Sequence, residues 1–271
     1  MSQLFNITLS PELTQTHQRL IVKYINSSAS LSKSEWVEVL KAFDIMRTCF
    51  VTYQGKTRTF YSFYQKVIDD KYAVLLIDEL HKLENIELNG LRVAKRIGEQ
   101  IVKFLAEMGL NEPMPLEHRM LRAYCIFWWV SYAKGYITEL AIFQDLEKSS
   151  VHFHAHDLRN MEERFTPFDL IVLGLKGDVK SSTYFLYTMR SFPLRNSFYI
   201  AKLFDERRRT RLRVVIMKEE AWYQINGPSI ESALERVPEI FPAVASIYIK
   251  GEKLIVVEYE LWKQKVKAKQ L

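Results

Sequence analysis

The sequence contains little cysteine. Only Cys49 and Cys125 occur in 271 residues, which is too few for a disulfide framework or, alone, for a structural zinc site. We therefore expect a reduced intracellular setting, with the cytoplasm as the default location. No basic segment followed by an apolar stretch opens the chain, so a targeting signal is not indicated.

Long apolar runs are also missing. The strongest run, residues 121–133, contains Arg122 and reaches only about half of the roughly 20 residues that a membrane helix needs. The run therefore predicts a buried helix, and we expect no membrane partner.

Two motifs that define other enzyme classes are absent. Residues 72–80 resemble the Walker B strand of ATPases because an apolar run ends in Asp78 and Glu79, but no G-x-x-x-x-G-K-[ST] loop accompanies them. We therefore expect no nucleotide cofactor. No G-x-S-x-G elbow occurs either, and neither cysteine has a histidine at the spacing of a nucleophile pair.

The composition is that of a folded protein with a basic surplus. Hydrophobic residues make up 48%, charged residues 26%, and the net charge is +6, which excludes both a disordered chain and a membrane bundle. Both halves of the chain carry part of the surplus, so no basic tail explains it. The densest cluster is the best candidate for nucleic-acid contacts, although a solvated turn is the alternative; its members are Arg207, Arg208, Arg209, Arg211 and Arg213.

The pattern of elements predicts an α/β protein with two domains. Residues 1–112 are expected to form a mainly helical domain for recognition or partner contacts, and residues 113–271 a mixed β-sheet flanked by helices. The boundary is placed at residues 111–115 because Pro113 and Pro115 interrupt regular structure. Ser32 and Glu35 have the spacing of a capping box.

The individual elements follow from apolar periodicity and from turn residues. Helices are predicted at residues 11–25, 35–46, 59–68, 91–108, 116–132, 136–147, 196–207 and 229–236. Strands are predicted at residues 151–158, 168–173, 178–187 and 211–217, with a hairpin at 244–259.

Three charged residues stand at the ends of two apolar runs. Asp169 opens one run, Asp178 and Lys180 open the next, and Gly174 lies in the connection. A two-residue loop would pair Asp169 with Asp178, and a four-residue loop would pair it with Lys180. Since strand side chains alternate with period two, either register puts the three on one face. Burying them unpaired would be costly, so a metal or a polar ligand is the natural partner.

This segment resembles the restriction-endonuclease-like, or PD-(D/E)XK, nuclease superfamily over residues 135–217. Members have a helical glutamate, a strand, an aspartate at the start of a second strand, and (Asp/Glu)-x-Lys on a third. Glu139, Asp169, Asp178 and Lys180 match these positions. Phe168 separates Pro167 from Asp169, so the Pro-Asp dipeptide is absent, and the gap between the two aspartates is short.

The resemblance implies a restriction-endonuclease-like fold and a Mg²⁺-dependent endonuclease, with Mn²⁺ as a substitute metal. Glu139, Asp169 and Asp178 would hold the metal, and Lys180 would activate water or stabilise the transition state. Glu147, Glu162 and Glu163 are rivals for the role of Glu139. DNA is the expected substrate, and a homodimer is compatible because many such nucleases dimerise to cut both strands.

Other interpretations stay open. The chain is alternatively a non-catalytic nucleic-acid-binding or assembly module on a nuclease-like fold, or a small-molecule enzyme in which Asp-x-Lys is incidental. His152, His154 and His156 share one face of a predicted strand and would form either a transition-metal site or a half-exposed polar face.

Two further segments resemble functional motifs but also have a structural interpretation. A second acid-x-Lys triplet, Asp69-Asp70-Lys71, lacks a paired strand and is interpreted as a solvated surface run. The basic and aromatic residues at 56–66 would either grip a nucleic acid or belong to the core.

Overall fold

The chain folds into two units, as seen in a computed structural model that describes residues 5–160, 162–183, 185–188, 193–205, 210–227 and 244–271. The first unit comprises Met1–Lys82 with Leu91–Ala133, and the second comprises Leu83–Gly90 with Lys134–Leu271. The boundary expected at residues 111–115 therefore lies inside the first unit. The reason is helix α6 (Leu116–Lys148), which is continuous and contributes residues to both units.

Helix α6 also joins two helices that were expected to be separate. Gly135 lies within it, and an interior glycine costs a helix only about 1 kcal/mol relative to alanine. The hydrogen-bonding pattern of the neighbouring turns therefore continues through this position.

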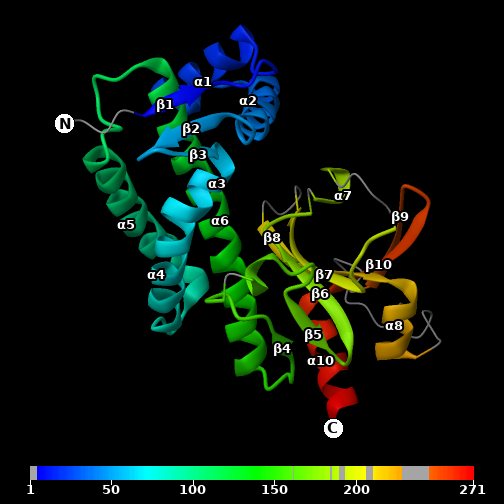
Figure 1. Cartoon of the computed structure of the whole chain (residues 1–271). Coiled ribbons are helices and arrows are strands. Elements are labelled where there is room, and N and C mark those ends of the chain that lie inside the picture. Colours follow the sequence, from blue (N-terminus) through cyan, green and yellow to red (C-terminus); the bar gives the residue numbers. More distant parts are fainter. Residues whose placement is uncertain (1–4, 161, 184, 189–192, 206–209, 228–243) are drawn as a thin grey trace. The chain divides into compact units, whose positions relative to one another are not determined.

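The first unit combines helices with a small antiparallel sheet (Figure 1). Its strands, in the order β1-β2-β3, are Asn6–Thr8, Phe50–Tyr53 and Lys56–Thr59. Its helices are α1 (Gln15–Ser27), the 3-10 turn η1 (Ser28–Ser30), α2 (Lys33–Met46), α3 (Phe60–Phe63), the π-helix η2 (Tyr64–Asp69), α4 (Asp70–His81), most of α5 (Ile86–Glu107) and α6 up to Ala133.

Capping residues set the starts of the first helices. The Ser32 hydroxyl accepts from the backbone N–H of Glu35, whose carboxylate accepts from the N–H of Ser32, so the predicted capping box is confirmed. Helix α1 begins at Gln15 rather than at residue 11 as predicted, because the side chain of Thr14 accepts from the backbone N–H of His17.

Aromatic side chains form much of the interior of the first unit. Phe43 of α2 stacks on Phe127 of α6 with ring centroids 4.0 Å apart. Phe60, Phe63 and Tyr64 are fully buried, so the aromatic residues at 56–66 largely belong to the core. Residues 72–80 lie within helix α4 and not in a strand, which removes the likeness to Walker B.

The second unit is built on a mixed sheet whose described strands follow the order β4-β5-β6-β7-β8-β10-β9. Only the β6–β7 pair is parallel among the described pairings of this sheet. The strands are β4 (His154–Ala155), β5 (Leu170–Val172), β6 (Leu175–Lys180), β7 (Phe198–Asp205), β8 (Thr210–Lys218), β9 (Val244–Ile249) and β10 (Glu252–Glu258). The remaining elements are the 3-10 turn η3 (Glu163–Phe165), α7 (Phe185–Thr188), α8 (Glu219–Asn226) and α10 (Tyr259–Gln270).

Some of the elements predicted for this unit are confirmed and others are wrong. The hairpin at 244–259 and the strand at 211–217 are confirmed as β9–β10 and β8. The helix predicted at residues 196–207 is wrong, because Phe198–Asp205 form strand β7, which pairs on both sides. Of the strand predicted at 151–158, only the two residues of β4 form a strand. The strand predicted at 178–187 ends at Lys180, and its last residues belong to helix α7. The helix predicted at 229–236 lies outside the described residues.

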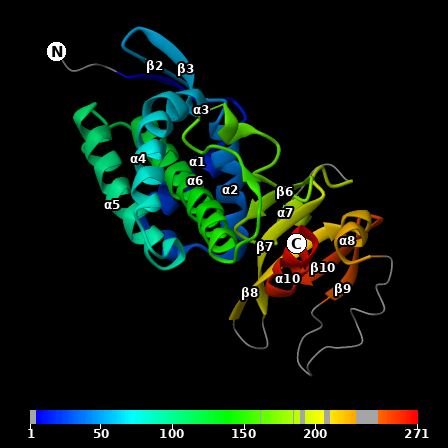
Figure 2. The same ribbon diagram turned by 90° about the horizontal axis from the view of Figure 1, so that it is seen from below.

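Helices lie against both faces of the sheet in the second unit. Leu186 of α7 packs with Tyr199 and other residues of one face, and Trp262 of α10 meets the ring of Phe198 on the other at 5.4 Å between centroids. Figures 1 and 2 both show α10 beside the strands. Neighbouring residues of β7 therefore point to opposite layers, as the period of a strand requires.

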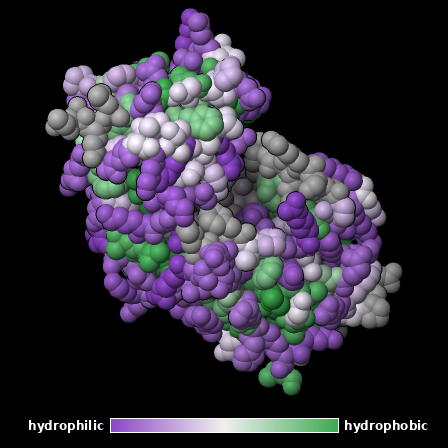
Figure 3. Space-filling model, in the orientation of Figure 1, coloured by the Kyte–Doolittle hydropathy of each residue, from purple (hydrophilic) through white to green (hydrophobic). Residues whose placement is uncertain are grey.

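None of the described helices is long and apolar enough to cross a membrane. Figure 3 agrees with this, since the coloured residues on the face that it shows are mostly hydrophilic.

Candidate active site

The β5–β6 hairpin brings the two predicted aspartates together. Leu170 pairs with Gly177, and in this register Asp169 lies opposite Asp178. The loop is Leu173-Gly174, and both residues have positive φ, at 52° and 77°, which is the signature of a type I′ turn. The two-residue alternative for the hairpin is thus confirmed.

Asp178 and Lys180 point to the same face of β6. Lys180 Nζ donates to Asp178 Oδ1 at 2.6 Å, and the Oδ2 atom of Asp169 accepts from the backbone N–H of Val179 at 2.6 Å. In the parallel pair with β7 these residues align with Tyr199 and Ala201. The other face of β6 carries Gly177, and a Cβ atom there would collide with the ring of Phe198.

Glu139 joins the hairpin from helix α6. Its side chain is 15% exposed, and its Oε2 atom lies 3.3 Å from Nε2 of His156. Of its three rivals, Glu147 and Glu162 are exposed. The carboxylate of the third, Glu163, is occupied by N–H donors of Asp157 and Asn160.

His156 is a site residue that the sequence indicated only as one of three histidines on one face of a predicted strand. Its side chain is only 4% exposed, and its backbone N–H donates to the carbonyl of Asp169 at 3.0 Å. His152 and His154 are exposed, so the three histidines do not form one metal-binding face. Histidines alternate with apolar residues from Val151 to His156, but this alternation does not distinguish the one histidine that faces Glu139.

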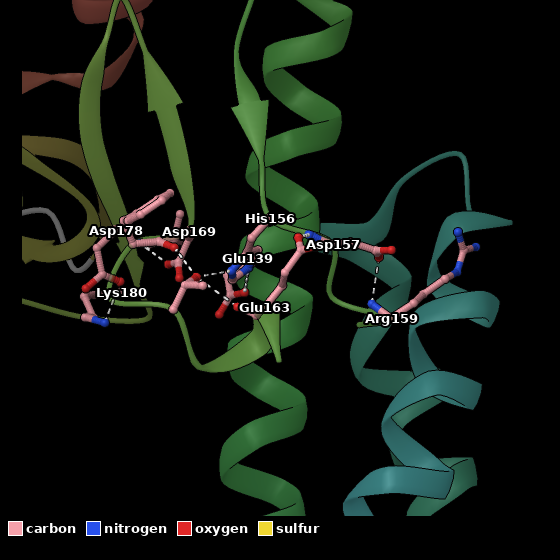
Figure 4. A network of polar contacts seen from close by, with 11 residues as sticks. Glu139, His156, Asp157, Arg159, Glu163, Asp169, Asp178 and Lys180 are labelled. Atoms are coloured by element: carbon pink, nitrogen blue, oxygen red, sulfur yellow. Dashed lines mark hydrogen bonds and ion pairs between the residues drawn. The ribbon is translucent and has the colours of Figure 1, made fainter. Parts of the chain in front are cut away.

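Glu139, His156 and Asp169 form the tightest group of potential metal ligands among the described residues. One ligand atom of each lies within 4.8 Å of the others. Asp178, which was expected to complete the ligand set, is outside this group and pairs with Lys180 instead. Figure 4 shows Asp169 between the Asp178–Lys180 pair and the Glu139–His156 pair.

Burial and mutual repulsion dominate the electrostatics of the carboxylates. Burial and the charge of Asp169 raise the pKa of Asp178 to about 7, because the attraction of Lys180 offsets only part of both effects. Burial and the charge of Glu139 likewise raise the pKa of Asp169. Negative charge at this corner of the unit is therefore costly unless a cation compensates it.

Burial acts in the opposite direction on the pKa values of the two basic groups, His156 and Lys180. Burial lowers the pKa of His156, but the hydrogen bond and charge of Glu139 outweigh it and leave the pKa above its usual value. For Lys180, burial also lowers the pKa, and the charge of Asp178 more than restores it. Both groups are thus stabilised as cations by the carboxylates that they contact.

The arginine cluster is described only in part. Arg207, Arg208 and Arg209 lie outside the described residues, as does the side chain of Arg211. Arg213 of β8 pairs with Glu87 and lies 4.0 Å from Asp145. Its guanidinium is 18% exposed, so acidic partners within the second unit already compensate much of its charge.

Comparisons of the chain with protein-family models, with curated proteins and with solved structures found no match. The site itself offers two buried carboxylates, a third that is partly exposed, an imidazole and an ammonium group in one corner of an α/β unit. Such a set can bind a divalent cation and hold a lysine beside it.

Proposed function

We propose that this protein is a metal-dependent nuclease that hydrolyses phosphodiester bonds, with DNA as the substrate. The observation that carries the proposal is the approach of Glu139 to Asp169, beside the Asp178–Lys180 pair. These residues come from a helix, from the start of one strand and from the next strand, which is the order of the PD-(D/E)XK pattern.

The connections between the strands support the same proposal. In the superfamily that the sequence resembles, the segment with the catalytic residues runs through a helix and three successive strands. Here α6 is followed by β4, β5 and β6 as an antiparallel series. Strand β7 then pairs parallel to β6, which requires a crossover connection. A restriction-endonuclease-like fold is accordingly part of the proposal.

The donor set fits a divalent metal ion. Carboxylate oxygens are the preferred ligands of Mg²⁺ and Mn²⁺, and the raised pKa values of Asp169 and Asp178 reflect burial and negative charge that Lys180 compensates only in part. Glu139 and Asp169 would hold the ion, with Asp178 at the border of the site. When bound, such an ion polarises a phosphate and lowers the pKa of a water molecule.

The chain's own residues supply the remaining functions. Lys180, 37% exposed and held by Asp178, presents an ammonium group that would stabilise the charge developing on the phosphate or orient the attacking water. The backbone N–H of Val179 donates to Oδ2 of Asp169, which fixes the orientation of this carboxylate. The hairpin thus positions both a metal ligand and a cation for phosphate.

The proposal is tested by cleavage of plasmid, linear duplex and single-stranded DNA in the presence of Mg²⁺ or Mn²⁺. We expect cleavage by the wild type and a loss of about a hundredfold or more in the folded variant Asp178→Ala. The matched control is Lys176→Ala, which changes an exposed residue of the same strand and leaves the rate unchanged. Equal cleavage by wild type and Asp178→Ala would overturn the proposal, as would a wild type inactive on all three substrates.

A further inference from the structure

His156 is built into the site more firmly than a chance neighbour would be. Its side chain is nearly inaccessible, and its backbone is hydrogen-bonded to Asp169. Its ring also makes a T-shaped contact with the ring of Phe143 from α6, at 6.3 Å between centroids. Both ring nitrogens face polar partners, Nδ1 toward Thr166 and Nε2 toward Glu139.

The hydrogen bonds of Thr166 determine which ring nitrogen carries a proton. The Thr166 hydroxyl donates to the carbonyls of Glu163 and Phe168, at 2.9 and 2.8 Å. Since the single hydroxyl proton is used there, Oγ1 accepts from Nδ1–H of His156 at 3.2 Å. Nε2 is therefore the nitrogen that can give up its proton, now hydrogen-bonded to Glu139, and offer a lone pair to a cation, as in histidines that bind metals and whose other nitrogen donates to a supporting group.

The distances are those expected around one metal ion. Ligands about 2.1–2.2 Å from an octahedral ion lie roughly 3 Å apart when adjacent and roughly 4.3 Å apart when opposite. Nε2 of His156 and Oε2 of Glu139 are 3.3 Å apart, and the group with Asp169 spans at most 4.8 Å.

We propose that His156 is a direct ligand of the metal ion, through Nε2, and that it makes the site prefer Mn²⁺ to Mg²⁺. This inference rests on the proposed function, because it concerns the same metal. Mg²⁺ favours oxygen ligands and gives up its water reluctantly, whereas imidazole suits first-row transition metals. A nitrogen ligand among carboxylates thus shifts selectivity from Mg²⁺ towards Mn²⁺.

The first test measures binding rather than cleavage. Free Mn²⁺ is quantified by electron paramagnetic resonance during titration of the full chain, and Mg²⁺ is added as a competitor. We expect the wild type to bind Mn²⁺ at least about tenfold more tightly than Mg²⁺. In His156→Ala, Mn²⁺ affinity should fall about 10–100-fold and Mg²⁺ affinity less than about threefold, so that the preference disappears.

The matched control is His154→Ala, which removes an exposed imidazole two residues away and should leave both affinities unchanged. A second measurement covers the case that His156→Ala fails to fold. The spin-echo envelope modulation of Mn²⁺ bound to the wild type should contain the signal of an imidazole nitrogen, and that signal should be present in His154→Ala and absent in His156→Gln.

The outcomes separate this inference from the proposed function. If Mn²⁺ binds without nitrogen modulation, or if folded His156→Ala keeps the wild-type Mn²⁺ preference, His156 is not a ligand, although metal-dependent cleavage can still stand. If the wild type binds neither Mn²⁺ nor Mg²⁺, the inference and the proposed function fail together.

Discussion

Two acid-x-Lys triplets occur in this chain, and they behave differently. Asp178 and Lys180 lie on a strand, on one face, with a 2.6 Å ion pair between them. Asp69 and Lys71 lie where the π-helix η2 passes into α4. Residues two apart on a helix point in nearly opposite directions, so the same pattern brings its charges together only on a strand.

The helical triplet is also not the solvated run that the sequence suggested. Asp69 is 2% exposed and accepts from the Tyr64 hydroxyl at 3.4 Å, whereas Lys71 lies over the rings of Tyr72 and Phe104 at 5.0 Å. A buried aspartate is therefore not by itself a mark of catalysis. The second carboxylate and the facing lysine distinguish Asp178.

The largest expected effect is the difference in DNA cleavage between variants of the two lysines, Lys180 and Lys71. Lys180→Ala should reduce DNA cleavage by about a hundredfold or more, because the ammonium group beside the proposed metal site is lost. Lys71→Ala, which removes an exposed lysine from the other triplet, should leave the rate within about twofold. Initial rates at saturating Mn²⁺ check this, and equal losses in both variants would contradict it.

A smaller effect is expected from the residue that precedes the strand triplet. Gly177→Ala places a methyl group against the buried ring of Phe198, so the sheet must shift to accommodate it. We expect the free energy of unfolding to fall by about 2–3 kcal/mol, measured by urea denaturation. Gly55→Ala, whose added methyl would meet no neighbouring atom but which has a φ of 72°, separates backbone strain from crowding and should cost about 1 kcal/mol.

The smallest effect concerns pH in the absence of metal. The pKa of Asp178 is raised to about 7 in the folded protein, so the native state binds more protons than the unfolded state between about pH 4 and pH 7, and stability falls as pH rises through that window. Asp178→Asn removes the penalty and should stabilise the protein by about 1–2 kcal/mol at pH 8, with a smaller gain at pH 5.

The control for this prediction is Asp70→Asn in the other triplet, which should change stability by about 0.5 kcal/mol or less at either pH. Thermal unfolding in EDTA at pH 5 and pH 8 provides the measurement. A stabilisation by Asp178→Asn that does not grow with pH would contradict the assigned cause.

The sequence was sufficient to predict the local parts of the site. Alternating strand residues placed Asp169, Asp178 and Lys180 on one face in either register, and the structure then showed that the loop is the two-residue turn Leu173-Gly174. Glu139 was predicted through a resemblance to known nucleases and not through any local signal. His156 could be named only together with His152 and His154, because it is tertiary packing that buries it against Glu139 while the other two stay exposed.

The wrong helix at residues 196–207 has a similar cause. The run Phe198–Asp205 is mostly apolar, and a short apolar run does not distinguish a buried strand from a helix. Its neighbours β6 and β8 supply hydrogen bonds on both edges, and these pairings come from distant parts of the sequence. The division into two units differs from the expected boundary at residues 111–115 for a related reason, since α6 contributes residues to both units.

The two-residue turn between β5 and β6 limits how this part of the gene can change in length. One codon gained or lost between Asp169 and Asp178 would turn one aspartate away from the other, since side chains alternate along each strand. Two codons added to the turn would restore the original orientation. Insertions here are therefore expected to persist among functional descendants only in even numbers.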